Sequence, residues 1–168
     1  TIDKKITPMT SVEVEGEQIG QGRAKVFRSD KVTSLEDEEI KDLKTLGIDI
    51  ETYNPEGKKM DAEKNPIIMM SFYGKDYAKV ITWKKFKTKE KYIEFVDSEL
   101  ELIERFKEIL TEYKPEAITG YFSDEFDIPY IGVRAKKYKI ILDIGLDGSE
   151  IKINNREVTK ARIPGIVH

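Results

Sequence analysis

Three carboxylates in two segments are the strongest candidates for chemistry in this sequence. Asp49 and Glu51 lie two residues apart in the segment 46–51, whose apolar and polar residues alternate. Alternation with a period of two predicts a β-strand, so both carboxylates leave the same strand face, about 7 Å apart along the backbone. Two negative charges this close, on a strand with an apolar second face, are costly unless a cation lies between them. A divalent metal ion would remove that cost; a solvated strand face is the alternative interpretation.

The third candidate, Asp127, ends the acidic segment 124–127, just before a helix that the pattern predicts over about 128–139. Pro129 suits the first turn of this helix. An aspartate at such a place commonly caps the helix by accepting amide hydrogen bonds. A helix N-terminus also suits an acidic group that faces a phosphate or a metal ion. Both interpretations stay open on the residues alone.

Two absences narrow the chemistry. The sequence has no cysteine, and its one histidine is the last residue, His168. Disulfides, thiolate nucleophiles, cysteine-based zinc sites and Ser-His-Asp triads are therefore excluded or implausible. Carboxylates, tyrosine, lysine and hard metal ions bound through oxygen remain for catalysis.

Composition predicts one ordinary globular domain with a sizeable core in 168 residues. The 29 basic residues stand against 32 acidic ones, for a net charge of −3. Proteins that wrap duplex DNA are usually basic, so any contact with nucleic acid is expected to be local or mediated by metal ions. No apolar run approaches the roughly 20 residues of a membrane span, and the first residues show no signal-peptide pattern. We expect a cytoplasmic protein without a membrane partner.

Six elements follow one another in the order β-β-β-α-β-α, which predicts an α/β fold with a mixed sheet. They are expected over residues 46–51, 67–73, 79–83, 98–113, 117–121 and about 128–139. Short links between the first three predict an antiparallel meander. Ser98 and Glu101 form a capping box at the start of the first helix. The crossover through this helix should place strand 117–121 parallel to strand 46–51.

The remaining segments carry less specific patterns. Residues 1–34 read as short strands and turns, and the acidic stretch 36–39 as one or two helical turns or a charged loop. The tail, 141–168, predicts one or two hairpins. The segment 84–92 mixes lysines with aromatic residues; it could hold a single strand, although a solvated loop is the simpler interpretation. Basic residues of the second helix should form its solvated face: Arg134, Lys136, Lys137 and Lys139.

These segments together resemble the 3′–5′ proofreading exonuclease region of family B DNA polymerases, the archaeal branch especially. The segment 49–52, Asp-Ile-Glu-Thr, resembles the first exonuclease motif of that family, and 119–130, Thr-Gly-Tyr-Phe-Ser-Asp-Glu-Phe-Asp-Ile-Pro-Tyr, resembles the second. Segments 79–83 and 147–150 are also similar to family segments, in the expected order. The resemblance covers about 35–168 and implies a ribonuclease H-like fold, with 1–34 as a remnant of the polymerase N-terminal region and 35–168 as the exonuclease domain.

The resemblance also implies a chemistry and a set of partners. Two divalent metal ions, Mg²⁺ or Mn²⁺, would be held with Asp49 bridging both, Glu51 on the ion that activates water and Asp127 on the other. Tyr121, Phe122 and Phe126 would contact the substrate, the single-stranded 3′ end of a DNA primer. The implied protein partners are the polymerase palm, fingers and thumb domains, and a sliding clamp through the full-length protein.

Two departures from the family pattern leave alternatives open. Phe122 stands where the family usually has Asn, and the third motif, Tyr-x-x-x-Asp, is expected downstream of His168, since 162–168 resembles the stretch that leads to it. The expectation is an exonuclease domain truncated before its third motif and weak or inactive as a fragment. The alternatives are a degenerate exonuclease-like module with a structural or nucleic-acid-binding role, and a ribonuclease of the same fold.

Overall fold

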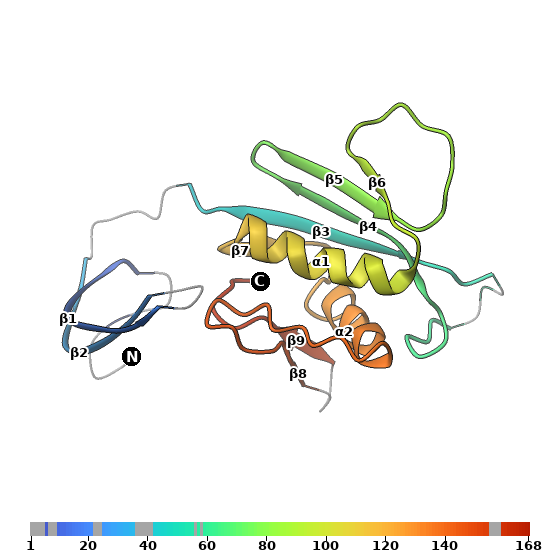
Figure 1. The fold of residues 1–168 in the computed structure, drawn as a ribbon. Coiled ribbons are helices and arrows are strands. Elements are labelled where there is room, and N and C mark those ends of the chain that lie inside the picture. The colour runs from blue at the N-terminus through green and yellow to red at the C-terminus, as the bar shows by residue number, and fades with distance from the viewer. Residues whose placement is uncertain are drawn as a thin grey trace. The chain divides into compact units, whose positions relative to one another are not determined.

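The computed structural model describes residues 6, 10–21, 25–35, 42–55, 57, 59–154 and 159–168. The chain divides into two compact units, Thr1–Leu43 and Lys44–His168 (Figure 1). The first unit contains one sheet and the second contains two, and the candidate carboxylates all belong to the second unit.

The first unit is an antiparallel hairpin of β1, Val12–Gln21, and β2, Lys25–Ser34. These strands are longer than the short ones expected for this region. The register shifts at Glu15/Gly16, where a Cβ on Gly16 would lie 2.3 Å from the carbonyl oxygen of Arg28. Only glycine permits so close an approach of the two backbones. The acidic stretch 36–39 lies outside the described residues.

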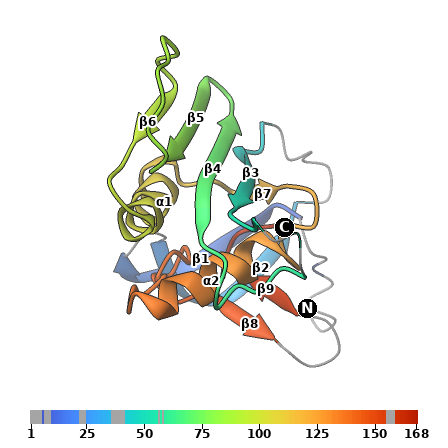
Figure 2. The same ribbon diagram turned by 90° about the vertical axis from the view of Figure 1, so that its right-hand side faces the viewer.

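The second unit contains a five-stranded mixed sheet in the order β6-β5-β4-β3-β7, and Figure 2 shows the strands side by side. The strands are β3, Thr45–Thr52; β4, Ile67–Gly74; β5, Tyr77–Thr82; β6, Ile93–Phe95; and β7, Ala117–Thr119. The antiparallel meander β3-β4-β5 is confirmed, as is the parallel pairing of β7 with β3. Strand β6, which the sequence pattern does not reveal, pairs parallel to β5.

One face of this sheet packs on α1, Glu99–Tyr113 (Figure 1). The buried residues of β3 are its even-numbered ones, Leu46, Ile48 and Ile50, as the alternation predicts. Ser98 caps the helix by accepting the amide of Glu101 at 3.2 Å. The other half of the expected capping box differs by one residue, because the Glu101 carboxylate accepts the amide of Asp97, not that of Ser98.

The second helix, α2, Asp127–Lys137, lies beside the antiparallel hairpin of β8, Lys152–Asn154, and β9, Lys160–Arg162. The hairpin confirms the expectation for the tail. Neither of the two helices found in the described residues combines the length and the apolar composition that a membrane-spanning helix requires.

The solvated face expected for α2 is wrong at Arg134. Lys136, Lys137 and Lys139 are exposed, but Arg134 is only 2% exposed and forms a bidentate ion pair with Glu99 of α1. Its Nε and Nη2 atoms lie 2.7 and 2.5 Å from the two carboxylate oxygens. The sequence around Arg134 could not predict that its side chain is buried, because its partner Glu99 lies on another helix.

The Glu99–Arg134 pair is hydrogen-bonded on all sides. Glu99 also accepts the amide of Ile67 and the hydroxyl of Tyr138, both at 2.8 Å. Arg134 donates to the carbonyl oxygens of Ala62 and Glu63 at 3.0 and 3.1 Å. This network joins α1, α2, the start of β4 and the β3–β4 connection. It therefore fixes the position of α2 relative to the sheet.

We predict that Glu99→Ala lowers the free energy of unfolding by about 3–5 kcal/mol, because it leaves a buried guanidinium without its counter-charge. Urea denaturation followed by circular dichroism measures the change. The matched control is Asp97→Ala, which removes the exposed partner of Lys85 and should leave the unfolding midpoint essentially unchanged. Equal effects of the two substitutions would contradict a central role for the buried pair.

Candidate active site

Strand β3 holds Asp49 and Glu51 on the sheet face opposite α1. Both side chains are exposed, whereas the intervening Ile50 is buried in the core. The register sets Ser71 opposite Asp49 and Met69 opposite Glu51. The shared face predicted from alternation is therefore present, and it is open to solvent along this part of β3.

Asp127 approaches the same strand from the start of α2. The turn before the helix can lie against β3 because Gly120 has no side chain: a Cβ there would be 2.6 Å from the carbonyl oxygen of Ile48. The N-cap position of α2 is occupied by Phe126, without a side-chain cap. The capping interpretation of Asp127 is therefore wrong, because Asp127 is the first residue of the helix itself. Its carboxylate accepts hydrogen bonds from the backbone amides of Ile50 and of Asp127.

The electrostatics of Asp127 place it beside Asp49. Burial and, to a smaller extent, the negative charge of Asp49 together raise the pKa of the Asp127 carboxyl to about 6, against the opposing effect of the backbone amides of Ile50 and Asp127. Asp127 is only 2% exposed, whereas its partner Asp49 faces solvent. Two carboxylates from distant parts of the chain thus form a like-charged pair that a shared cation would stabilise.

Glu51 does not complete a cluster with this pair. Across the described residues, no three His, Cys, Asp or Glu side chains come close enough together to hold a metal ion. Asp49 and Asp127 supply hard oxygen donors of the kind that Mg²⁺ and Mn²⁺ prefer, and both ions tolerate several water ligands. The donor set therefore fits a divalent cation shared by the two aspartates, with Glu51 two residues along the same face.

The three candidate substrate-contacting aromatics lie in and beside the turn before α2. Tyr121 is 87% exposed and meets Phe122 edge-to-face, with ring centroids 4.8 Å apart. Phe126 is partly exposed and packs on Tyr130 at 5.5 Å. Large exposed rings next to paired carboxylates suit stacking on unpaired bases.

Phe122 has a left-handed backbone, with φ of 58°. This conformation costs a residue with a Cβ about 1–2 kcal/mol, whereas Asn tolerates it through local hydrogen bonds. The carbonyl of Phe122 accepts the amide of Phe126 at 2.7 Å, so the strained residue also closes the turn that precedes α2. Asn, the residue that the family resemblance leads us to expect here, would suit this backbone better than Phe does.

The open sheet face continues from Asp49 into a shallow groove of about 580 Å³. The groove is lined by residues of β3, β4, β5 and β7, among them Tyr73, and by Tyr92 and Tyr121. Sequence analysis missed Tyr73, although its place in the alternation of β4, opposite Gly47, puts it on the face of Asp49.

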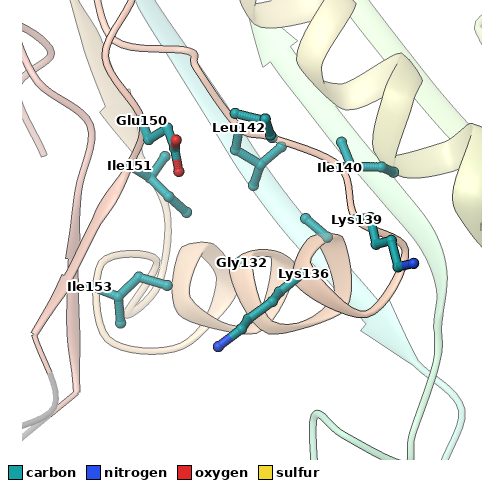
Figure 3. Close-up of a pocket in the computed structure, with 10 residues that line it drawn as sticks. Gly132, Lys136, Lys139, Ile140, Leu142, Glu150, Ile151 and Ile153 are labelled. Atoms are coloured by element: carbon teal, nitrogen blue, oxygen red, sulfur yellow. The ribbon is translucent and has the colours of Figure 1, made fainter.

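A second hollow, of about 510 Å³, lies between α2 and the segment 140–153; Figure 3 shows its apolar side chains, with Lys136 extending away from them. None of the three candidate carboxylates lines it.

The sequence model described as DNA polymerase family B, exonuclease domain, matches residues 1–168. The chain belongs to the exonuclease domain family of the family B DNA polymerases. The family B exonuclease domain is a family of hydrolases with a ribonuclease H-like fold, and the mixed sheet with its two helices agrees with that fold.

Archaeal DNA polymerases are among the relatives of this family B exonuclease domain. A DNA polymerase of Pyrococcus glycovorans is 44% identical over 128 residues, which are 76% of this chain and 16% of that polymerase. A DNA polymerase of Methanocaldococcus jannaschii is 38% identical over 168 residues, or 99% of this chain and 9% of the relative. The chain therefore spans less than a fifth of the length of either relative.

A solved structure supports the same assignment. The family B DNA polymerase from the hyperthermophilic archaeon Pyrobaculum calidifontis superposes with a TM-score of 0.76 at 25% identity, covering 98% of this chain and 20% of that one.

We predict that Asp127→Asn stabilises the metal-free family B exonuclease domain at pH 7.5 by roughly 1–3 kcal/mol. The folded-state pKa of about 6 exceeds the usual 3.8, so folding favours the protonated acid. The stability that Asp127 contributes is present below about pH 4 and is lost as the pH rises through 6. Urea denaturation in EDTA at several pH values measures this.

The control for this prediction is Asp124→Asn, three residues earlier and outside the pair. In wild type, the free energy of unfolding should fall between pH 4 and 7. Asp127→Asn should reduce this fall, and Asp124→Asn should leave it unchanged. A destabilising effect of Asp127→Asn at pH 7.5 would contradict the like-charged pair.

Proposed function

We propose that the chain is the 3′–5′ proofreading exonuclease region of a family B DNA polymerase, which removes mismatched 3′-terminal nucleotides by phosphodiester hydrolysis. The observation that supports this most strongly is the pairing of Asp49 with buried Asp127 on the open sheet face. A like-charged pair with one member buried lowers the stability of the fold, and strongly shifted pKa values of this kind cluster at functional sites.

The proposed cofactors are two divalent ions, Mg²⁺ or Mn²⁺. Asp49 would hold both ions, Glu51 the one beside the attacking water and Asp127 the other. When bound, such ions lower the pKa of the attacking water and stabilise the leaving 3′ oxygen. The protein's own contribution is to fix the donor oxygens: β3 presents Asp49, and the Ile50 amide orients Asp127.

The proposed substrate is the single-stranded 3′ end of a DNA primer. Tyr121, Phe122 and Phe126 would stack on the unpaired bases and align the terminal phosphodiester with the carboxylates. Stacking tolerates any base, which suits an activity that removes whatever nucleotide is mismatched.

The proposed setting is a full-length cytoplasmic polymerase. Residues 1–34 would belong to the polymerase N-terminal region and 35–168 to the exonuclease domain, which would act with the palm, fingers and thumb domains. A sliding clamp would be reached through the full-length protein.

A degenerate module that binds nucleic acid without cutting it is the second candidate. Two observations favour it: Phe122 occupies a strained backbone position that suits Asn, and Glu51 forms no three-carboxylate cluster within the described residues. Retention of Asp49, Glu51 and Asp127 favours the enzyme.

The deciding experiment uses this chain extended to include the downstream Tyr-x-x-x-Asp motif expected from the family. With Mg²⁺, the extended protein should release nucleotides from a primer with a mismatched 3′ end. Asp127→Ala should reduce the rate by at least about a hundredfold, because a metal ligand is lost. Radiolabelled primer resolved on denaturing gels measures the rate.

Phe122→Asn separates the two candidates. If the site is degenerate, the extended protein is inactive, and Phe122→Asn alone can restore cleavage. Activity that survives Asp127→Ala would contradict the proposed mechanism in either case.

A further inference from the structure

The face of the sheet beside Asp49 is built as a continuous surface across four strands. Cross-strand partners share a face, and the pairing Gly47↔Thr119, Gly47↔Tyr73 and Tyr73↔Ala78 therefore forms one row. A second row runs from Asp49 through Ser71 to Val80. These residues lie opposite the α1 face, so the groove floor continues directly from the carboxylate site.

Small residues surround Tyr73 in this groove. Gly47 and Ala78 flank Tyr73 on the neighbouring strands, and a Cβ on Gly47 would already lie 3.3 Å from the carbonyl oxygen of Tyr73. Tyr73 itself is 75% exposed, and its ring takes part in none of the aromatic pairs found among the described residues. A large exposed ring above a floor of small residues leaves room for a planar group to lie on it.

Two further tyrosines line the groove with Tyr73. Tyr121, from the turn after β7, lines it on the side of β3. Tyr92 lines it on the side of β5, where its carbonyl accepts the amide of Val80 at 2.8 Å. Aromatic rings on an open sheet are how several RNA-binding domains stack two or three successive bases; here Tyr73 lies on a strand, and Tyr92 and Tyr121 lie next to strands.

Charge complementarity comes from the lysine-rich segment that leads to Tyr92. Lys84 lies over the ring of Trp83, and Lys85 pairs with Asp97. The other three lysines of the segment are exposed and form no ion pair with any described residue: Lys87, Lys89 and Lys91. Of these, Lys91 directly precedes Tyr92, which lines the groove. A cation next to an aromatic groove can contact the phosphates of a strand whose bases stack on the rings.

We propose that this groove is a second subsite for single-stranded nucleic acid, in which a base stacks on Tyr73 between Tyr121 and Tyr92, with the charge of Lys91 beside Tyr92. The subsite rests on the proposed function in one respect only, which is the path of the nucleic acid. The bound nucleic-acid strand would run across the sheet, starting from the Asp49–Asp127 pair. It would hold the unpaired strand beyond the nucleotide that is removed.

The test measures the binding of a fluorescein-labelled hexathymidylate to the 168-residue chain by fluorescence anisotropy, at low salt and in EDTA so that nothing is cleaved. Tyr73→Ala should weaken binding about 5- to 150-fold, the usual effect of losing one base–aromatic stack. Tyr73→Phe keeps the ring and should bind as wild type does. Phe27→Ala removes an exposed ring of β2 and serves as the matched control.

An oligonucleotide with abasic positions makes the test independent of protein stability. Wild type should bind it as weakly as Tyr73→Ala binds hexathymidylate, and Tyr73→Ala should lose little more, because both changes remove the same stack. Hexauridylate in place of hexathymidylate shows whether the subsite accepts RNA as well as DNA.

The outcomes separate the subsite from the proposed function. No binding by wild type, or equal binding by wild type and Tyr73→Ala, would overturn the subsite and leave the function to the cleavage assay. Binding that is lost in Tyr73→Ala, together with cleavage that is unchanged by Asp127→Ala, would support the subsite and overturn the proposed mechanism.

Discussion

The arrangement of the candidate site depends on one constraint: a carboxylate buried against a strand that carries another carboxylate. Asp127 is held by the Ile50 amide, so it cannot move away from Asp49 without losing a buried hydrogen bond. The cost of this pairing appears as the raised pKa of Asp127. A protein selected for stability alone would place Asn or an apolar residue there. The left-handed backbone at Phe122 and the close approach of Gly120 to β3 position the turn so that Asp127 lies against β3.

The rest of the fold holds α2, and with it Asp127, in a fixed position. The N-terminal end of α2 is tied to β3, and its C-terminal half is tied to α1 by the Glu99–Arg134 pair. Between them, the Tyr130 hydroxyl donates to the carbonyl oxygen of Asn65 at 2.7 Å. A helix fixed at both ends holds its first residue more accurately than a loop could, which is what a site built from few donors requires.

The sequence predicted those features that depend on local periodicity. Alternation in β3 identified both the strand and the face of Asp49 and Glu51, and the crossover rule predicted β7 beside β3. Features that depend on distant partners were not predictable. Arg134 looked like part of a solvated face because Glu99 lies on another helix. Asp127 looked like a helix cap because nothing local shows that the Ile50 amide is within reach. The left-handed backbone of Phe122 is likewise hidden, since Phe is not a residue that favours it.

The central claim is that Asp49 and Asp127 share a cation, and titration calorimetry with Mn²⁺ tests it directly. With two carboxylates and much of the coordination left to water, wild type should bind weakly but with a saturable heat. Asp49→Ala and Asp127→Ala should each abolish that heat, while Asp97→Ala, at an exposed acid away from the pair, should keep it. Equal heats for wild type and Asp49→Ala would contradict the account, because the ion would then be held somewhere else.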